Sequence, residues 1–121
     1  MDGPVNLAEA LATFDEVFRP RTVATLNDYK VMVVKVRGEF VWHAHPETDD
    51  FFLVLDGQLT IELRDRDVVL GRGDLFVVPR GVEHRPRSAD GAELLLIEPQ
   101  GTVNTGDAEP SALTAPEQRL R

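Results

Sequence analysis

The chain has 121 residues, of which 42% are hydrophobic and 28% charged, so it can bury the core of one domain but not of two. Its net charge of −8 argues against nucleic acid and anionic membrane surfaces as partners, because both require clustered Lys and Arg. The lack of cysteine excludes disulfides, thiolate metal sites and cysteine nucleophiles. No basic leader with an apolar core and no apolar run of membrane-spanning length is present, so a soluble, cytoplasmic protein is expected.

Residues 5–18 show the pattern of a short amphipathic helix. Asn6 can cap it, Glu9 occupies the capping-box position, and Pro20 lies just beyond its end. Its apolar face consists of four residues at helical spacing, Leu7, Leu11, Phe14 and Phe18. Because an isolated helix of this length is marginal in water, we expect residues 1–21 to form a helical extension that packs on the sheet.

From Thr22 onward the apolar residues alternate with a period of two, which predicts β-strands. The strands are expected at 22–26, 29–37, 40–45, 50–55, 59–63, 68–70, 75–78, 82–86 and 92–98. Many short strands separated by turns, of which Asp56-Gly57 is the strongest, predict an antiparallel sandwich or barrel over 22–99. Residues 100–121 lack periodicity and are expected either to pack on the barrel or to be partly disordered.

The three histidines are the candidate functional residues. On a strand, His43 and His45 would project from the same face, and the carboxylate of Asp50 follows a short loop later. His84 follows a Pro-x-Gly turn that begins at Pro79. A single histidine is more often structural than a ligand, but imidazoles beside a carboxylate suit a first-row metal ion.

The spacing in these two segments is specific. The first reads His43-x-His45-x4-Asp50-x6-Gly57, and the second reads Gly73-x5-Pro79-x-Gly81-x2-His84. Together they resemble the two signature motifs of the cupin superfamily, in its small single-domain form, over residues 29–98. The chain departs from that pattern in three places: Asp50 replaces the usual Glu, Ser88 the usual Asn, and Gly38 lies one residue closer to His43 than usual.

The resemblance implies an all-β fold, a double-stranded β-helix or jelly-roll barrel, which the short N-terminal helix would accompany. It also implies one divalent transition metal ion inside the barrel, either Fe, Mn, Ni, Cu or Zn. Carried over to this sequence, the ligands would be His43, His45, Asp50 and His84. Because Asp is one methylene shorter than Glu, Asp50 either binds after a shift of the strand or binds through water, and Asp49 and Glu47 are the alternatives.

Strand parity predicts which side chains surround such an ion. Val41, Phe52 and Val54 would form an apolar wall, with Glu39 as a polar member. Such a pocket would suit a small organic ligand. No second general base is evident, since Tyr29 and Glu83 are better interpreted as surface residues.

Two functions follow from the resemblance. The first is a metal-dependent enzyme acting on a small molecule, either a dioxygenase, an isomerase or a lyase. The second is a non-catalytic, metal-containing domain that binds or senses a small molecule. Trp42 and the strand 51–55, which is apolar on both faces, need partners on both sides, so a homodimer is expected.

Overall fold

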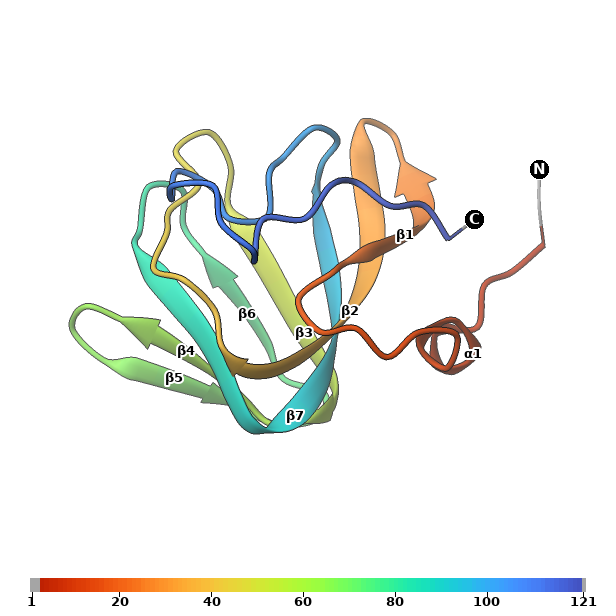
Figure 1. The fold of residues 1–121 in the computed structure, drawn as a ribbon, viewed down its shortest axis with the longest axis horizontal. Helices are drawn as coiled ribbons and strands as arrows, with labels where there is room; N and C mark the ends of the chain where they lie inside the picture. Colours follow the sequence, from red (N-terminus) through yellow and green to blue (C-terminus); the bar gives the residue numbers. More distant parts are fainter. Residues whose placement is uncertain (1–2, 121) are drawn as a thin grey trace.

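The regular structure of the chain is almost entirely antiparallel β-sheet, as the computed structural model of residues 3–120 shows (Figure 1). The elements are α1 (Leu7–Leu11), β1 (Arg21–Leu26), β2 (Tyr29–Glu39), β3 (Asp50–Gly57), β4 (Leu59–Leu63), β5 (Asp67–Leu70), β6 (Leu75–Val78) and β7 (His84–Pro99). Residues 1–2 and 121 of the expected terminal segments lie outside the described residues. The predicted all-β fold with a short N-terminal helix is confirmed.

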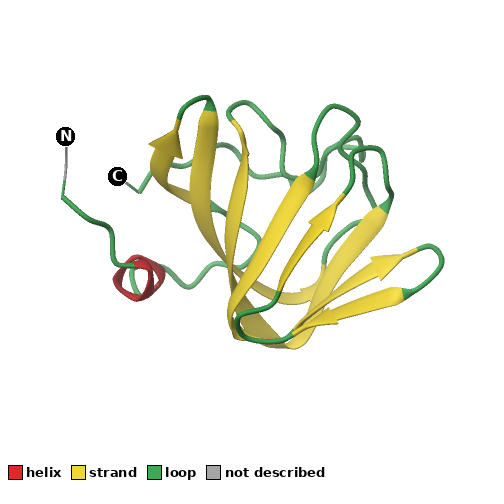
Figure 2. Ribbon diagram, turned by 180° about the vertical axis from the view of Figure 1, so that it is seen from behind, coloured by secondary structure: helices red, strands yellow, loops and turns green. Residues whose placement is uncertain are grey.

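The long strand β7 joins the two parts of the barrel, which are the strands β1, β2, β3 and β6 and the β4–β5 hairpin. Residues 87–88 and 92–99 of β7 pair with β2, residues 92–97 also pair with β3, and residues 84–87 also pair with β4. The sheet order is therefore β1-β2-β7-β3-β6, with the β4–β5 hairpin attached to the other end of β7. Because one strand serves both parts, the sheet curls around a common interior, as the predicted jelly roll requires (Figure 2).

The bend in β7 depends on close backbone packing. Its register against β2 shifts between the pairs Val36–Ala92 and Gly38–Ser88. The Ser88 hydroxyl donates to the Gln58 carbonyl at 2.6 Å and accepts from the Gly91 amide at 3.1 Å. At Gly57 a Cβ would lie 2.3 Å from the Gly91 carbonyl oxygen, and φ is +82°, so both space and conformation require glycine. Ser88, which stands where the motif usually has Asn, thus stabilises the bend.

The N-terminal helix is shorter than predicted, because it ends at Leu11 rather than near residue 18. Phe14 packs outside the sheet with Leu11, whereas Phe18 belongs to the barrel interior. A continuous helix would place both rings on one face, so the chain leaves the helix between them. Phe18 has a φ of +58°, and its amide donates to the Lys35 carbonyl at 2.8 Å. Tertiary packing therefore overrides the helical pattern.

Three of the predicted strands, 40–45, 82–86 and 92–98, are not separate strands in the structure. Residues 40–45 form no strand; they are joined to β7 by an isolated bridge between His43 and His84 and by a hydrogen bond of 2.9 Å from the Phe40 amide to the Pro86 carbonyl. The predicted strands 82–86 and 92–98 are parts of one continuous strand, β7. Gly38, with a φ of +86°, lies beside the register shift near the end of β2.

The alternation of side chains gives the sheet two apolar faces. The interior is filled by one cluster, whose fully buried members are Val54, Leu59, Ile61 and Leu94 among others. The outer face carries two rows of apolar side chains across the strands. One row runs through Val77, Phe51 and Ile97, and the other through Leu75, Leu53 and Leu95.

The helix covers only one end of this outer face. Ala10, Leu11 and Phe14 pack over Val33 of β2, with Leu95 at the margin of their cluster. On the edge strand β6, Leu75 and Val77 remain 53% and 40% exposed. The outer apolar surface is thus increasingly uncovered from β2 toward β6.

Residues 100–120 return along the barrel, crossing one end of it before passing β1 (Figure 1). Thr22 and the residues near the C-terminus exchange two hydrogen bonds, both of 2.8 Å, from the Thr22 amide to the Gln118 carbonyl and from the Leu120 amide to the Thr22 carbonyl. The ammonium group of Lys30 binds the Glu117 carboxylate at 2.8 Å and the Thr102 carbonyl at 3.1 Å. The division into segments 1–21, 22–99 and 100–121 stays a prediction.

Candidate metal centre

The fold gathers four side chains that are far apart in the sequence. Their potential ligand atoms all lie within 4.8 Å of one another, and all four residues are buried: His43, His45, Asp50 and His84. This group could hold a metal ion. That each of the four residues binds it directly stays a prediction.

Backbone hydrogen bonds bring the two histidine-bearing segments together. The His43 amide donates to the His84 carbonyl at 3.0 Å, and the His84 amide donates to the His43 carbonyl at 2.9 Å. One step further, the Gly81 amide donates to the His45 carbonyl at 3.0 Å. The ring centroids of His43 and His84 consequently lie 4.3 Å apart.

Two of the imidazole rings are oriented by the backbone. Nδ1–H of His43 donates to the Val41 carbonyl, and Nδ1–H of His84 donates to the Val82 carbonyl, both at 2.9 Å. Donation from Nδ1 leaves the lone pair of a neutral ring on Nε2. A carbonyl partner on the remote nitrogen is the usual support of a metal-binding histidine.

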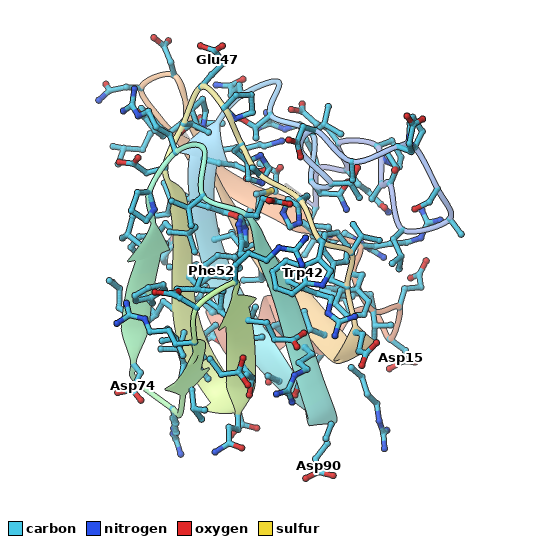
Figure 3. All side chains as sticks on the ribbon, turned by 90° about the vertical axis from the view of Figure 1, so that its left-hand side faces the viewer. Asp15, Trp42, Glu47, Phe52, Asp74 and Asp90 are labelled. Carbon is cyan, nitrogen blue, oxygen red and sulfur yellow. The ribbon has the colours of Figure 1, made fainter. Side chains whose placement is uncertain are left out.

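Asp50 reaches the centre of the group despite its short side chain. Its Oδ2 lies 2.9 Å from Nε2 of His84 and 3.4 Å from Nε2 of His45. Neither alternative carboxylate does so: Asp49 accepts the Arg80 amide at 2.9 Å near the surface, and Glu47 projects outward from its loop (Figure 3). Strand β3 begins at Asp50 and pairs it with Val78, which directs its side chain inward.

The contact between Asp50 and His84 requires a proton or a cation between the two atoms. Nδ1–H of His84 is already committed to a carbonyl, so a neutral ring would direct its Nε2 lone pair at a carboxylate oxygen 2.9 Å away. Two acceptors repel each other at that distance. A proton on Nε2, or a cation held between the two atoms, removes the repulsion.

The pKa shifts of His43 and Asp50 favour the forms of these side chains that bind metal ions. Burial and the neighbouring His84 lower the pKa of His43 to about 4, so this ring is neutral at pH 7. Burial would raise the pKa of Asp50, but its hydrogen bonds with His45 and His84 outweigh burial and lower it to about 2. Burial likewise opposes charge on His45, yet the hydrogen bond and charge of Asp50 raise its pKa overall. Neutral imidazole and ionised carboxylate are the forms that bind metal ions.

A small cavity of about 50 Å³, which we call the barrel cavity, lies against the candidate ligands. Its walls are mostly apolar, formed by residues such as Phe18, Phe40, Phe52 and Leu96. A more open groove of about 340 Å³ borders His45 from the loop 46–48 and the segment 100–106. The candidate ligands thus border one small apolar cavity, and His45 also borders a wider groove.

Of the four residues predicted to line the pocket, the barrel cavity includes Phe52 alone. Val54, two residues after Phe52 on β3, is fully buried in the core. Glu39 is exposed and pairs with Arg85 at 3.3 Å, and Val41 contributes its carbonyl to His43. The predicted parity of Glu39 and Val41 assumed a strand over 40–45, which the chain does not form.

Glu98 is a polar group of the barrel cavity that the sequence interpretation missed. It is 6% exposed, and its carboxylate lies 3.6 Å from the ammonium group of Lys30. Burial and the charge of Asp50 raise the pKa of Glu98 to about 7, against the opposing effect of Lys30. The alternation from Leu94 and Leu96 to Glu98 along β7 was the signal that could have identified it.

Asn104, from the segment after β7, also lines the barrel cavity. In sequence this segment has no periodicity, so no pattern indicated that it reaches the site.

Among residues 3–120, no helix is long and apolar enough to cross a membrane.

Comparison with known proteins gives a consistent answer. A cupin-domain family model matches residues 30–98. The crystal structure of a cupin-2 domain containing protein from Shewanella frigidimarina is 41% identical in sequence, with a TM-score of 0.79 over 79% of this chain and 94% of that one.

Two curated relatives are longer than the matched region. The uncharacterized protein YdbB of Bacillus subtilis is 38% identical over 68 residues, which are 55% of this chain and 60% of YdbB. The 3-hydroxyanthranilate 3,4-dioxygenase of Xanthomonas euvesicatoria is 24% identical over 111 residues, which are 86% of this chain and 63% of that enzyme. The matches thus span less than two thirds of either relative.

The family model covers more than half of the chain, and its two motifs meet in the barrel as their resemblance predicted, so the chain belongs to the cupin family.

Proposed function

We propose that the protein is a metal-dependent enzyme that acts on a small organic molecule at the group His43, His45, Asp50 and His84. The observation that carries the proposal is the contact between Nε2 of His84 and Oδ2 of Asp50, two acceptors 2.9 Å apart that need a cation or a proton between them. Three imidazoles and one carboxylate suit Fe, Mn, Ni, Cu or Zn. A bound ion of this kind supplies a Lewis acid or, as iron, reactivity with O₂.

Other residues of the chain would orient the ligands, exclude water and transfer protons. The Val41 and Val82 carbonyls hold two rings in one tautomer and orientation, which preorganises the ligands. Phe18, Phe40 and Phe52 exclude water from the inner side of the site. Glu98 lies on the same cavity wall as His45 and Asp50 and can hold a proton at its carboxylate near neutral pH. A carboxyl group with such a pKa is suited to general acid–base catalysis.

Among the possible reactions, O₂-dependent cleavage of a hydroxylated aromatic compound is the first to test. Its support is the similarity to a 3-hydroxyanthranilate 3,4-dioxygenase over 86% of the chain. Isomerase and lyase reactions need the same Lewis acid and proton-transfer group. The barrel cavity of about 50 Å³ is too small for such a substrate, so we infer that it enters through the 340 Å³ groove beside His45.

Metal binding is tested by comparing substitutions at two neighbouring carboxylates, Asp50 in the site and Asp49 outside it. The purified protein is expected to contain one transition metal ion per chain. Asp50→Asn, and more strongly the double variant His43→Ala/His45→Ala, should lower metal affinity, the latter by more than about 100-fold since it removes two ligands. Asp49→Asn is the matched control, because Asp49 lies near the surface and binds the Arg80 amide. Elemental analysis and chelator competition measure the effect, and unchanged metal content in the double histidine variant would refute the site.

Catalysis is tested by oxygen uptake with the metal-loaded protein. The substrates to screen are 3-hydroxyanthranilate, catechols, flavonols, thiols and 1,3-diketones. We expect uptake with a hydroxylated aromatic compound that is lost in the double histidine variant. Tight binding of one of these compounds without any turnover would instead support the alternative, a non-catalytic domain that binds or senses a small molecule.

The protonation of Glu98 predicts how stability depends on pH. Since its pKa is raised from 4.5 to about 7 in the folded state, the proton stabilises the fold fully below pH 4.5, and this contribution is lost as the pH rises to about 7. In the metal-free protein, Glu98→Gln should therefore gain stability relative to the wild type across this window, by on the order of 3 kcal/mol. Chemical denaturation at several pH values measures it, and a constant difference between the two proteins would contradict the shift.

The homodimer is also a proposal, and the outer face of the sheet supports it. Leu75 and Val77 on the edge strand β6 are exposed beside the partly buried Phe51, Leu53 and Ile97. Trp42, by contrast, is covered within the chain, because the Arg64 guanidinium lies 3.8 Å from its ring centroid. Of the two features that predicted a homodimer, only the apolar strand β3 still requires a partner. The cytoplasmic location stays a prediction.

Substitution on β6 tests the dimer. The wild type should have twice the 13.5 kDa mass of one chain in light scattering, and Leu75→Lys/Val77→Lys should have the mass of a monomer, because two charges would be buried at the interface. Val69→Lys on β5, where Val69 is 55% exposed, is the control and should stay dimeric. A wild-type protein that is monomeric at high concentration would exclude the proposal.

A further inference from the structure

The segment that carries His43 and His45 is held by the sheet on one side only. Among residues 40–49 of the described chain there is no strand, and the bridge to His84 binds only one side of the segment. Two ligands of the candidate site therefore lie on a length of chain that needs another support.

That support comes from residues 104–107, which we call the clamp. In an extended chain, successive backbone groups point to opposite sides, so the amide and carbonyl of Ala44 face away from His84. Both are bound by one residue. The Ala44 amide donates to Oδ1 of Asp107 at 2.7 Å, and the Asp107 amide donates to the Ala44 carbonyl at 3.0 Å. Asp107 thus takes the place of a neighbouring strand at the residue between the two histidines.

The backbone beside Asp107 contacts the same peptide and the neighbouring ring. A Cβ at Gly106 would lie 2.3 Å from the Ala44 carbonyl oxygen and 3.1 Å from Cδ2 of His43, and φ is +54°. Only glycine allows the clamp to approach this closely. The clamp therefore lies close to the His43 ring as well as to the Ala44 peptide.

The clamp is itself fixed by the following residues. Thr105 is 1% exposed, and its hydroxyl lies 3.1 Å from that of Thr114. Asn104 donates from its side chain to the Leu113 carbonyl and accepts from the Ala115 amide, both at 2.9 Å. Asn104 also lines the barrel cavity. Rigid anchoring allows residues outside the barrel to set the geometry inside it.

We infer that the clamp sets the spacing of His43 and His45, with Asp107 as a positioning residue that raises the affinity of the site for its metal ion. The inference rests on the proposed metal site. Asp107 acts through the Ala44 peptide and is not itself a ligand. Because Asp107 is exposed, its truncation leaves no buried cavity, and the fold is expected to survive.

The experiment measures Co²⁺ affinity by chelator competition, together with the visible absorption of the bound Co²⁺, which reports ligand geometry. Asp107→Ala should weaken binding by about 10-fold, the lower end of the effect of outer-shell partners of metal ligands, and should alter the spectrum. Asp107→Asn keeps the acceptor oxygen and should restore most of the affinity. Asp90→Ala is the control, because it removes an equal charge. Asp90 lies at one end of the barrel and Glu47, from the loop after His45, lies at the other (Figure 3), so this variant should have no effect on Co²⁺ binding.

Three results would overturn the inference: wild-type affinity in Asp107→Ala, equal loss in the Asn and Ala variants, or equal loss in Asp90→Ala. The last two would indicate that charge, not the hydrogen bond, is responsible. If Asp107→Ala does not fold, Gly106→Ala replaces it and should also weaken binding, because its methyl group would push against the Ala44 carbonyl. Absence of Co²⁺ binding in the wild type would refute the metal site itself, which distinguishes that failure from failure of the clamp.

Discussion

The pair of backbone hydrogen bonds between His43 and His84 is the contact on which the candidate site depends. The same two segments share further backbone hydrogen bonds, from the Phe40 amide to the Pro86 carbonyl and from the Gly81 amide to the His45 carbonyl, but this pair brings the rings of His43 and His84 to a centroid distance of 4.3 Å. The loop closed by this contact is long, so its formation is entropically costly and must be supported by the barrel on either side. Within that frame, Asp50 needs only its short side chain, since β3 begins where the two histidine segments meet.

The same alternation along the strands produces both the core and the site. On β7, His84 at one end and Glu98 at the other are inward-facing positions, and Leu94 between them is part of the core. The apolar side chains at these positions exclude water, and exclusion of water is what shifts the pKa values of His43 and Glu98. The electrostatic properties of the site are therefore a consequence of how the barrel packs.

Those parts of the molecule that follow from local pattern could be predicted from the sequence. The period of two in the apolar residues predicts β2, β3 and β4. The spacing of the two motifs predicts that the histidines and Asp50 lie close together. Other features depend on contacts that local pattern does not encode. Phe14 and Phe18 have helical spacing but pack on opposite faces of the sheet. Residues 40–45 alternate like a strand, yet their neighbours are His84 and the clamp. Because this strand does not form, the prediction that Glu39 and Val41 line the pocket was wrong.

The Asp50 carboxylate has competing partners, and this competition determines how the site would respond to protons. In the structure its Oδ2 is shared between Nε2 of His45 and Nε2 of His84. A metal ion at the centre of the group would take both the carboxylate oxygen and the Nε2 lone pairs, so it must displace any proton that bridges them. Metal affinity should accordingly fall with decreasing pH, because protons and the ion occupy the same atoms. His43, which burial keeps neutral, contributes little to this competition, whereas His45 contributes more, since Asp50 raises its pKa.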